Sequence, residues 1–272
     1  MTAGTSLASS ARHASRGDAM AGLARFGLAS RAFVYLVIGW LAFQIALGHH
    51  SQQANQRGAL AEIASNTGGT VLLWLLAVGF AAYAIWRLSE AAFGTAAEGN
   101  EKGPRAQSAI RGVIYAALSV STFAFIAGSS QKGQSQQQAS TTAKVMKHDF
   151  GRWLVGIVGI VVVIVGVAMI VEGVKKKFLK QLRTGEMSPT QSKVVTRLGM
   201  VGTVARGIVF AMAGVLVVIA AVQYDPNKST GLDGALRTFA QAPAGPWILG
   251  ALAVGLIAFG VYGFAMARWA KT

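Results

Sequence analysis

The chain has 272 residues, of which 53% are hydrophobic and only 13% are charged, and its formal net charge is +15. A soluble domain carries about 25% charged residues, so this composition excludes an ordinary soluble protein. The absence of cysteine excludes disulfides, thiolate metal sites and a cysteine nucleophile.

Residues 1–22 precede the first apolar run and are rich in Ser and Ala. A terminal segment of small and polar residues buries too little apolar surface to fold, so we expect a disordered cytoplasmic tail. We expect no cleavable signal peptide, because more than twenty polar or small residues come first and no cleavage pattern follows a short apolar run.

Six apolar runs follow this tail. About 18 or more apolar residues with few charges predict a transmembrane helix. Residues 153–171 and 247–267 meet this length, and residues 70–86 come close to it. The other three runs, over residues 32–47, 112–128 and 207–222, are only marginally long enough. They reach the spanning length if their helices begin earlier, near Leu23, Pro104 and Met200.

The short runs open with one repeated motif. RAFVY at residues 31–35 recurs as RGVIY at 111–115 and as RGIVF at 206–210. Each is followed by a polar stretch and a second apolar run, and these second runs align without gaps. The sequence therefore predicts an all-α membrane protein with six transmembrane helices, built as three two-helix repeats over residues 23–94, 105–178 and 197–269.

Two helices return the chain to the side where it began, so all three repeats have one orientation. This predicts a pseudo-threefold bundle about an axis along the membrane normal, unlike transporters with inverted repeats. Within each repeat an outer loop of about twenty residues has apolar residues three apart, which predicts a short amphipathic helix. Glycines Gly159, Gly166 and Gly173 fall on one face of the fourth span, where we expect close helix packing.

Three tandem repeats that open with Arg25-Phe-Gly27 and then RAFVY resemble the bacterial membrane family called domain of unknown function 1206. The resemblance covers nearly the whole chain after residue 22. It implies six helices in an inner membrane and no established activity, and it transfers no catalytic residue, cofactor or metal. Repeat three diverges, because Met200 and Met266 stand where the other repeats have Arg and Glu.

Lysine and arginine are distributed unevenly about the predicted membrane. Of 25 such residues, 7 fall in the outer segments and the remaining 18 fall in the inner ones. Cytoplasmic loops carry an excess of Lys and Arg, so we predict a multi-pass protein of the inner membrane with both termini in the cytoplasm. A nucleic-acid partner is not expected, because no basic stripe is interleaved with exposed aromatic residues.

The repeated arginines Arg31, Arg111 and Arg206 lie just inside the predicted helix starts. In repeats one and two, Glu90 and Glu172 end the second helix at a similar depth, so we expect Arg31–Glu90 and Arg111–Glu172 ion pairs. The alternative is that these charges simply reach the interface and fix the helix ends.

Arg206 has no aligned acid in its own repeat. A lone guanidinium in hydrocarbon is costly, so the sequence suggests an anion there, most simply a phospholipid headgroup. Arg31 and Arg111 are candidates for the same anion-binding role. The basic run Lys175, Lys176 and Lys177 predicts either an anionic-lipid patch or a plain stop-transfer anchor. The loops containing His49-His50 and His148-Asp149 lack the fixed spacing of a metal site, and we expect none.

No motif of a nucleotide-binding loop, zinc protease or serine hydrolase is present. We therefore expect a non-enzymatic lipid-binding, packing or accessory protein without a cofactor. The candidate partners are anionic lipids and another membrane protein. The alternative is a transporter or channel for a small solute or ion, which needs a water-lined path faced by Gln44, Ser119 or Thr122. The sequence leaves the oligomeric state open.

Overall fold

The structure is a computed structural model, and it describes residues 3–49, 52–94, 102–128, 134–148 and 150–271. These residues form nine α-helices and three short 3₁₀ helices, and a single isolated bridge between Leu182 and Ala270 is their only β-type pairing. The α-helices are α1 Ala3–Ala46, α2 Gln56–Ala64, α3 Gly69–Phe93, α4 Lys102–Ile126, α5 Gln134–Met146, α6 Gly151–Val174, α7 Pro189–Gln223, α8 Gly231–Gln241 and α9 Gly245–Trp269.

Six of these helices are long and apolar enough to cross a membrane: α3, α4, α6, α7, α9 and the part of α1 from Asp18 to Ala46. The predicted all-α protein with six spans is therefore confirmed, and the chain is a multi-pass membrane protein. Short helices α2, α5 and α8 occupy the loops between paired spans, as the apolar spacing predicts.

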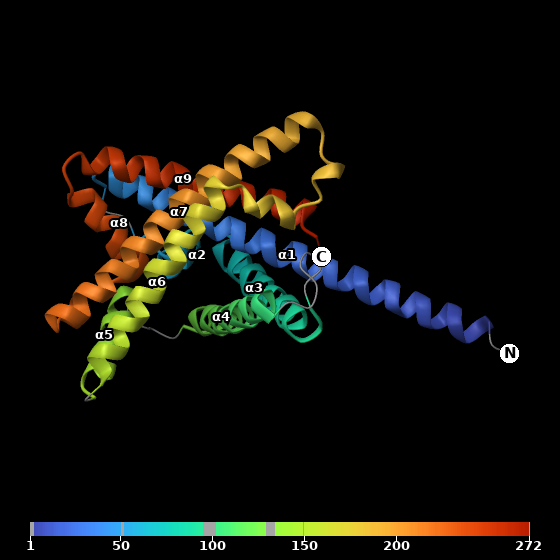
Figure 1. The fold of residues 1–272 in the computed structure, drawn as a ribbon, viewed down its shortest axis with the longest axis horizontal. Coiled ribbons are helices and arrows are strands. Elements are labelled where there is room, and N and C mark those ends of the chain that lie inside the picture. The colour runs from blue at the N-terminus through green and yellow to red at the C-terminus, as the bar shows by residue number, and fades with distance from the viewer. Residues whose placement is uncertain (1–2, 50–51, 95–101, 129–133, 149, 272) are drawn as a thin grey trace.

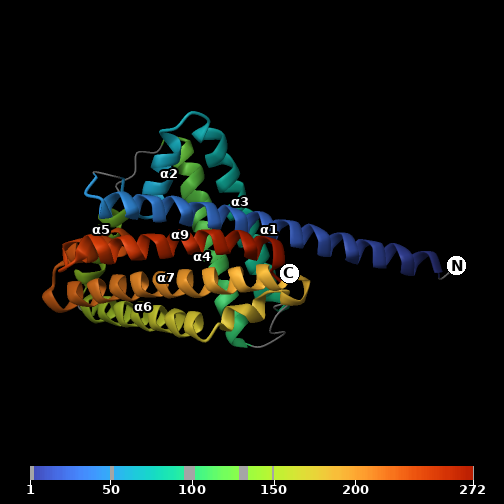
Figure 2. The ribbon, with the colours of Figure 1, turned by 90° about the horizontal axis from the view of Figure 1, so that it is seen from above.

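The most extensive helix contacts join neighbouring repeats. The second helix of each repeat packs against the first helix of the next, which gives the pairs α3 with α4, α6 with α7 and α9 with α1. Contacts of α1 with α3 and of α7 with α9 join the pairs, whereas α4 and α6 make no extensive contact within the described residues. Figure 2 shows α1, α9, α7 and α6 side by side, with α3 and α4 crossing them. The threefold axis itself stays a prediction.

Glycines allow the close approach of α6 and α7. A Cβ atom at Gly166 would lie 2.4 Å from the backbone nitrogen of Ala211, and one at Gly207 would lie 2.8 Å from the carbonyl oxygen of Gly166. Gly159 and Gly173 also face α7 at distances that no Cβ atom tolerates. The predicted role of this glycine face in helix packing is confirmed.

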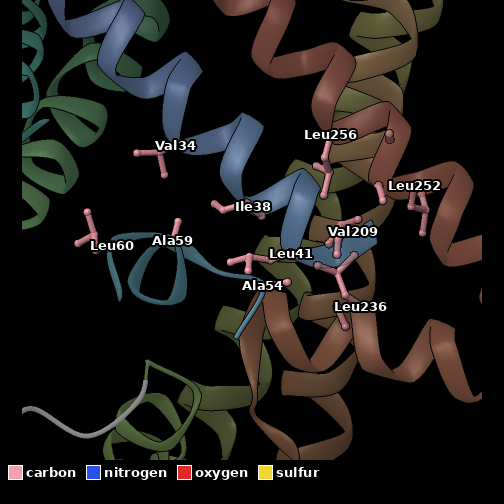
Figure 3. Packing of buried hydrophobic residues seen from close by; sticks show 14 of the residues in the cluster. Val34, Ile38, Leu41, Ala54, Ala59, Leu60, Val209, Leu236, Leu252 and Leu256 are labelled. Carbon is pink, nitrogen blue, oxygen red and sulfur yellow. The ribbon is translucent and has the colours of Figure 1, made fainter. Parts of the chain in front are cut away.

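The largest hydrophobic cluster joins all three repeats. Side chains of Val34, Ile38 and Leu41 on α1 lie between α2 on one side and α7, α8 and α9 on the other (Figure 3). The loops at this end are tied together by Asp233 of α8, which is 4% exposed. Its Oδ1 atom accepts a hydrogen bond from the backbone N–H of Ala54 at 2.8 Å. We call this end, with α2, α5 and α8, the capped end.

The opposite end carries the C-terminus and the linkers between repeats, and we call it the basic end. There the backbone N–H of Lys271 donates to the carbonyl oxygen of Gln181 at 2.9 Å, and that of Arg183 donates to Trp269 at 2.8 Å. Backbone hydrogen bonds therefore join residues 269 and 271 to the linker between repeats two and three.

Two expectations for this end differ from the structure. Residues 3–22 continue α1 as a helix that projects away from the bundle (Figure 1), in place of the predicted disordered tail over residues 1–22. Alanine, arginine and methionine favour helix here, and no proline interrupts it. In repeat three, α7 begins at Pro189 and not near residue 197, because Ser188 and Gln191 form a capping box and proline is well placed in the first turn.

Candidate anion-binding site

The repeated arginines converge near the basic end of the bundle. Arg111 on α4 lies within electrostatic range of Arg31 on α1 and Arg206 on α7, and also of Arg87 on α3. The three repeated arginines come from the same position of their repeats, one or more turns inside the helix. The cross-repeat pairing of the helices brings them to one region, which the expectation of pairs within each repeat did not foresee.

Arg31 is the most buried of the repeated arginines, with 9% of its surface exposed. Its Nη1 atom donates to the hydroxyl of Tyr83 at 3.2 Å, and its Nη2 atom reaches only the sulfur of Met266 at 3.7 Å. The buried Nε atom has no hydrogen-bond partner. Tyr83 and Phe259 place their rings 5.7 Å and 5.5 Å from the guanidinium carbon, so aromatic faces provide much of its stabilisation.

Arg206 is surrounded by aromatic rings. Its guanidinium carbon lies 5.2 Å from the ring centre of Tyr35, 5.0 Å from that of Phe210 and 4.9 Å from that of Phe259. Its Nε atom is buried without a hydrogen-bond partner. As the sequence predicts, no carboxylate pairs with Arg206 among the described residues, and Glu186 instead pairs with Arg183 at 3.1 Å.

Arg111 lines a pocket of about 50 Å³ at the basic end. The pocket lies between the ends of α3 and α9, the start of α4 and the linker that follows α6. Its lining includes three cations and one carboxylate, with the complete set being Trp86, Arg87, Glu90, Pro104, Gln107, Ser108, Arg111, Gln181, Met266, Ala270 and Lys271. We refer to this cavity as the basic pocket.

Glu90 is held in the wall of the basic pocket through its Oε2 atom. Its Oε2 atom accepts from Nη1 of Arg87 at 2.6 Å and from the hydroxyl of Ser108 at 3.1 Å. Arg87 also donates from Nε to the hydroxyl of Tyr83 at 3.0 Å, and that hydroxyl is the one that Arg31 contacts. A continuous hydrogen-bonded chain therefore links Glu90 to Arg31 through Arg87 and Tyr83.

Glu90 pairs with an arginine of its own repeat, but that arginine is not the repeated one. Glu90 pairs with Arg87 on its own helix and not with Arg31, and no ion pair joins Arg111 to Glu172 in the described part of the chain. Residues three apart on a helix are neighbours, so Arg87 reaches Glu90 first. Glu172 lies on α6, which makes no extensive contact with the α4 helix that carries Arg111.

Arg87 is the site residue that the sequence analysis did not single out. It lies in none of the repeated motifs and contributes to the sequence analysis only as one of the basic residues on the inner side. Its position three residues before Glu90, at the end of an apolar run, is the sequence feature that could have identified it. That spacing identifies a helical ion pair, and the ring of Trp86, 4.1 Å from the guanidinium carbon, adds to its burial.

Lys175, Lys176 and Lys177 follow α6 and are exposed. Lys176 has a left-handed backbone with φ of 54°, which turns the chain from α6 into a short 3₁₀ helix, Lys177–Gln181. A second and shallower hollow near this end is lined by Arg25, Arg183, Glu186, Arg268 and Trp269. The surface around the basic pocket is therefore also cationic.

The histidine loops are described only in part. His50 and Asp149 lie outside the described residues, so the suggested His49-His50 and His148-Asp149 groupings are not described. Among the residues that the structure describes, no three His, Asp or Glu side chains gather in a group that could hold an ion.

Known proteins place the chain in a family. The sequence model of a family described as Domain of Unknown Function (DUF1206) matches three times in tandem, over residues 26–94, 106–176 and 201–270. A protein of Bacillus subtilis (strain 168) with the description "Uncharacterized protein YxxB" is 30% identical over 241 residues, which cover 88% of this chain and 86% of the relative. No solved structure matches the chain significantly. The chain therefore belongs to the DUF1206 family, with one family unit in each of its three two-helix repeats.

Proposed function

We propose that this protein is a non-enzymatic membrane protein that binds the phosphate headgroup of an anionic lipid in its basic pocket. The observation that carries the proposal is a surplus of positive charge. Arg87, Arg111 and Lys271 supply three positive charges to the lining, and Glu90 supplies one negative charge, which leaves a net charge of +2.

The single carboxylate does not offset Arg111 or Lys271. Glu90 is already bonded to Arg87 and Ser108, and neither Arg111 nor Lys271 lies in an ion pair with any described carboxylate. A charged side chain inside a membrane costs about 2.5–3.5 kcal/mol at a helix centre and less near the interface. A bound anion offsets this cost, and phosphate accepts several charged hydrogen bonds at once.

The surroundings of Arg111 favour a lipid over a soluble anion. Neighbouring side chains Ile110 and Ile114 on α4 are 61% and 49% exposed, although they lie in a membrane span. In a membrane, these exposed side chains would contact acyl chains directly beside the pocket. A lipid could then place its headgroup in the pocket and its tails against the same helix, whereas a soluble anion has no tails to make that contact.

The same charge distribution supports the orientation of the protein. We infer that the basic end faces the cytoplasm of a bacterial inner membrane, because that leaflet carries anionic lipids and attracts basic segments. Lys175, Lys176 and Lys177 would then reach the headgroup layer, where each contributes roughly 1 kcal/mol. These lysines would raise the local concentration of anionic lipid near the pocket, but they do not line the pocket itself.

Buried hydroxyl groups favour this function over transport. Ser119 donates to the carbonyl oxygen of Ala77 on the neighbouring helix at 2.8 Å, and Thr122 donates to Leu118 within its own helix at 2.8 Å. A transport path would need these groups to face water. Both hydroxyls are instead bonded to backbone carbonyls, one across helices and one within α4, which supports a binding or accessory protein.

The experiment compares two matched variants of the full chain, Arg111→Gln in the pocket and Arg197→Gln on the exposed part of α7. Each is reconstituted in nanodiscs with phosphatidylglycerol in a phosphatidylcholine background, and retained lipid is counted by native mass spectrometry. Loss of a hydrogen bond to a charged group costs about 1.5–3 kcal/mol, so Arg111→Gln should weaken phosphatidylglycerol retention by at least about tenfold. Arg197→Gln should leave it unchanged. Equal retention in both variants would overturn the proposal.

A further inference from the structure

Arg31 lies behind the wall of the basic pocket and has an incomplete set of acceptors. It is nine-tenths buried, its Nε atom is unpaired, and the acceptor for Nη2 is a thioether sulfur. A methionine sulfur is a weak acceptor, and a guanidinium has five donor hydrogens. No carboxylate pairs with it in the described ranges.

Met266 separates this arginine from the pocket. Its side chain lines the cavity, and its sulfur lies 3.7 Å from Nη2 of Arg31. Methionine has three rotatable bonds and adapts readily to its surroundings, so its side chain can turn aside at little cost. An anion oxygen that replaced the sulfur would then meet Arg31 directly.

We propose, on the basis of the function above, that the pocket selects a dianionic phosphomonoester lipid headgroup, with Arg31 as its third cation behind Met266. Arg111, Lys271 and Arg31 are the three cations not offset by Glu90. A phosphomonoester has three terminal oxygens and a charge of about −1.5 to −2 at pH 7, whereas a phosphodiester has a single negative charge. The small volume, about 50 Å³, also suits a headgroup with nothing beyond the phosphate.

The divergence of repeat three makes this site possible. Met266 stands at the position where repeats one and two carry Glu90 and Glu172. A carboxylate at residue 266 would face Arg31 across the pocket wall and neutralise it. The thioether leaves the guanidinium positive and ready for an exogenous phosphate.

The experiment measures binding of phosphatidic acid and phosphatidylglycerol to the full chain in phosphatidylcholine nanodiscs, with glycerol 3-phosphate as a soluble competitor. At pH 7.5 we expect phosphatidic acid to bind about tenfold more tightly, since one added charged hydrogen bond is worth about that factor. The preference should narrow below pH 6, where the phosphomonoester dianion takes up a proton and becomes a monoanion. Glycerol 3-phosphate should compete only weakly, because it lacks the tails that contact α4.

Three variants test the third cation. Met266→Glu should abolish the preference by supplying an internal carboxylate to Arg31, and Met266→Leu, which cannot accept a hydrogen bond, should retain it. Arg31→Gln should lower the affinity for phosphatidic acid to that for phosphatidylglycerol. If Met266→Glu does not fold, this variant alone tests whether Arg31 is the third cation.

The possible failures are distinguishable. Equal binding of the two lipids, with both weakened by Arg111→Gln, would overturn the phosphomonoester preference and leave the lipid-binding function standing. Binding of neither lipid would overturn both proposals. Full competition by glycerol 3-phosphate would identify a soluble phosphomonoester as the ligand and overturn the lipid assignment.

Discussion

Arg87 and Glu90 lie one turn apart on α3, and Nη1 of the arginine is 2.6 Å from Oε2 of the glutamate. Both side chains are about nine-tenths buried, at 8% and 10% exposure. Tyr83 and Ser108 complete the hydrogen bonds of the pair. Burying charges is costly, so this pair is tolerated because its partners satisfy it from two helices.

Removal of one partner of this pair should be strongly destabilising. Glu90→Gln leaves Arg87 as an uncompensated buried charge, and we expect a loss of about 3–5 kcal/mol in the free energy of unfolding. The measurement is a denaturant titration of the protein in detergent micelles. The double variant Arg87→Met with Glu90→Leu should recover most of the loss, and a double variant as unstable as Glu90→Gln would contradict this account.

The contact between α6 and α7 should not tolerate a side chain at Gly166. Gly166→Ala places a Cβ atom 2.4 Å from the backbone nitrogen of Ala211, so the helices must separate. Overpacking costs about 1–3 kcal/mol, which a thermal unfolding experiment should detect. Gly156→Ala is the matched control on the same helix, because its nearest neighbour, Ala221, lies at an ordinary 3.7 Å. Equal stability of the two variants would show that α6 and α7 do not approach this closely.

Asp233 should stabilise the backbone at Ala54 in the capped end. Asp233→Ala leaves the N–H of Ala54 without its acceptor, and an unpaired buried donor costs about 1–3 kcal/mol. Hydrogen exchange at the amide of Ala54 should accelerate accordingly. The other partner of Asp233 is Arg237, whose Nε atom donates to Oδ2 of Asp233 at 3.0 Å. Arg237→Gln removes this bond and should leave exchange at the amide of Ala54 nearly unchanged. Slow exchange in Asp233→Ala would show that the amide is protected in another way.

Membrane orientation can be measured with single cysteines, because the natural chain has none. Thr67→Cys at the capped end and Thr190→Cys at the basic end both replace exposed residues. If both termini are cytoplasmic, as the positive charges predict, a membrane-impermeant maleimide should label Thr67→Cys in intact cells. Thr190→Cys should be labelled only after permeabilisation, and the reverse pattern would invert the topology.

Hydropathy and repetition were sufficient to predict the six spans and the three repeats. Long uncharged runs have few alternatives to a membrane helix, since unpaired backbone groups are too costly in lipid. The short helices α2 and α8 were predicted as well, because residues such as Leu60 and Leu236 recur at helical spacing. The extent of α7 was missed because a capping box at Ser188 extends it by about two turns into a polar segment.

The ion pairs were harder to predict because they depend on which helices touch. The sequence shows that Arg31 and Glu90 fall at similar depth, but not that α1 packs most closely against α9. The packing of α1 against α9 places Met266 and not a glutamate beside Arg31. Similar depth in the membrane is therefore not enough to predict an ion pair, because the helices that carry the two charges must also be neighbours.

The pairing of α9 with α1 also bears on how such a fold arises by duplication. The last helix, α9, packs against the first, α1, just as α3 packs against α4 and α6 against α7. Each repeat therefore pairs with the next in a cyclic order, and any of the three could come first in the chain. A circularly permuted chain that begins at repeat two and joins α9 to α1 by a new linker would keep every close pair. The bundle ends of α9 and α1 lie on the same side, so a short linker suffices once the projecting residues 3–22 of α1 are removed. A fourth unit appended to the C-terminus, by contrast, would have to displace α1 from its place against α9.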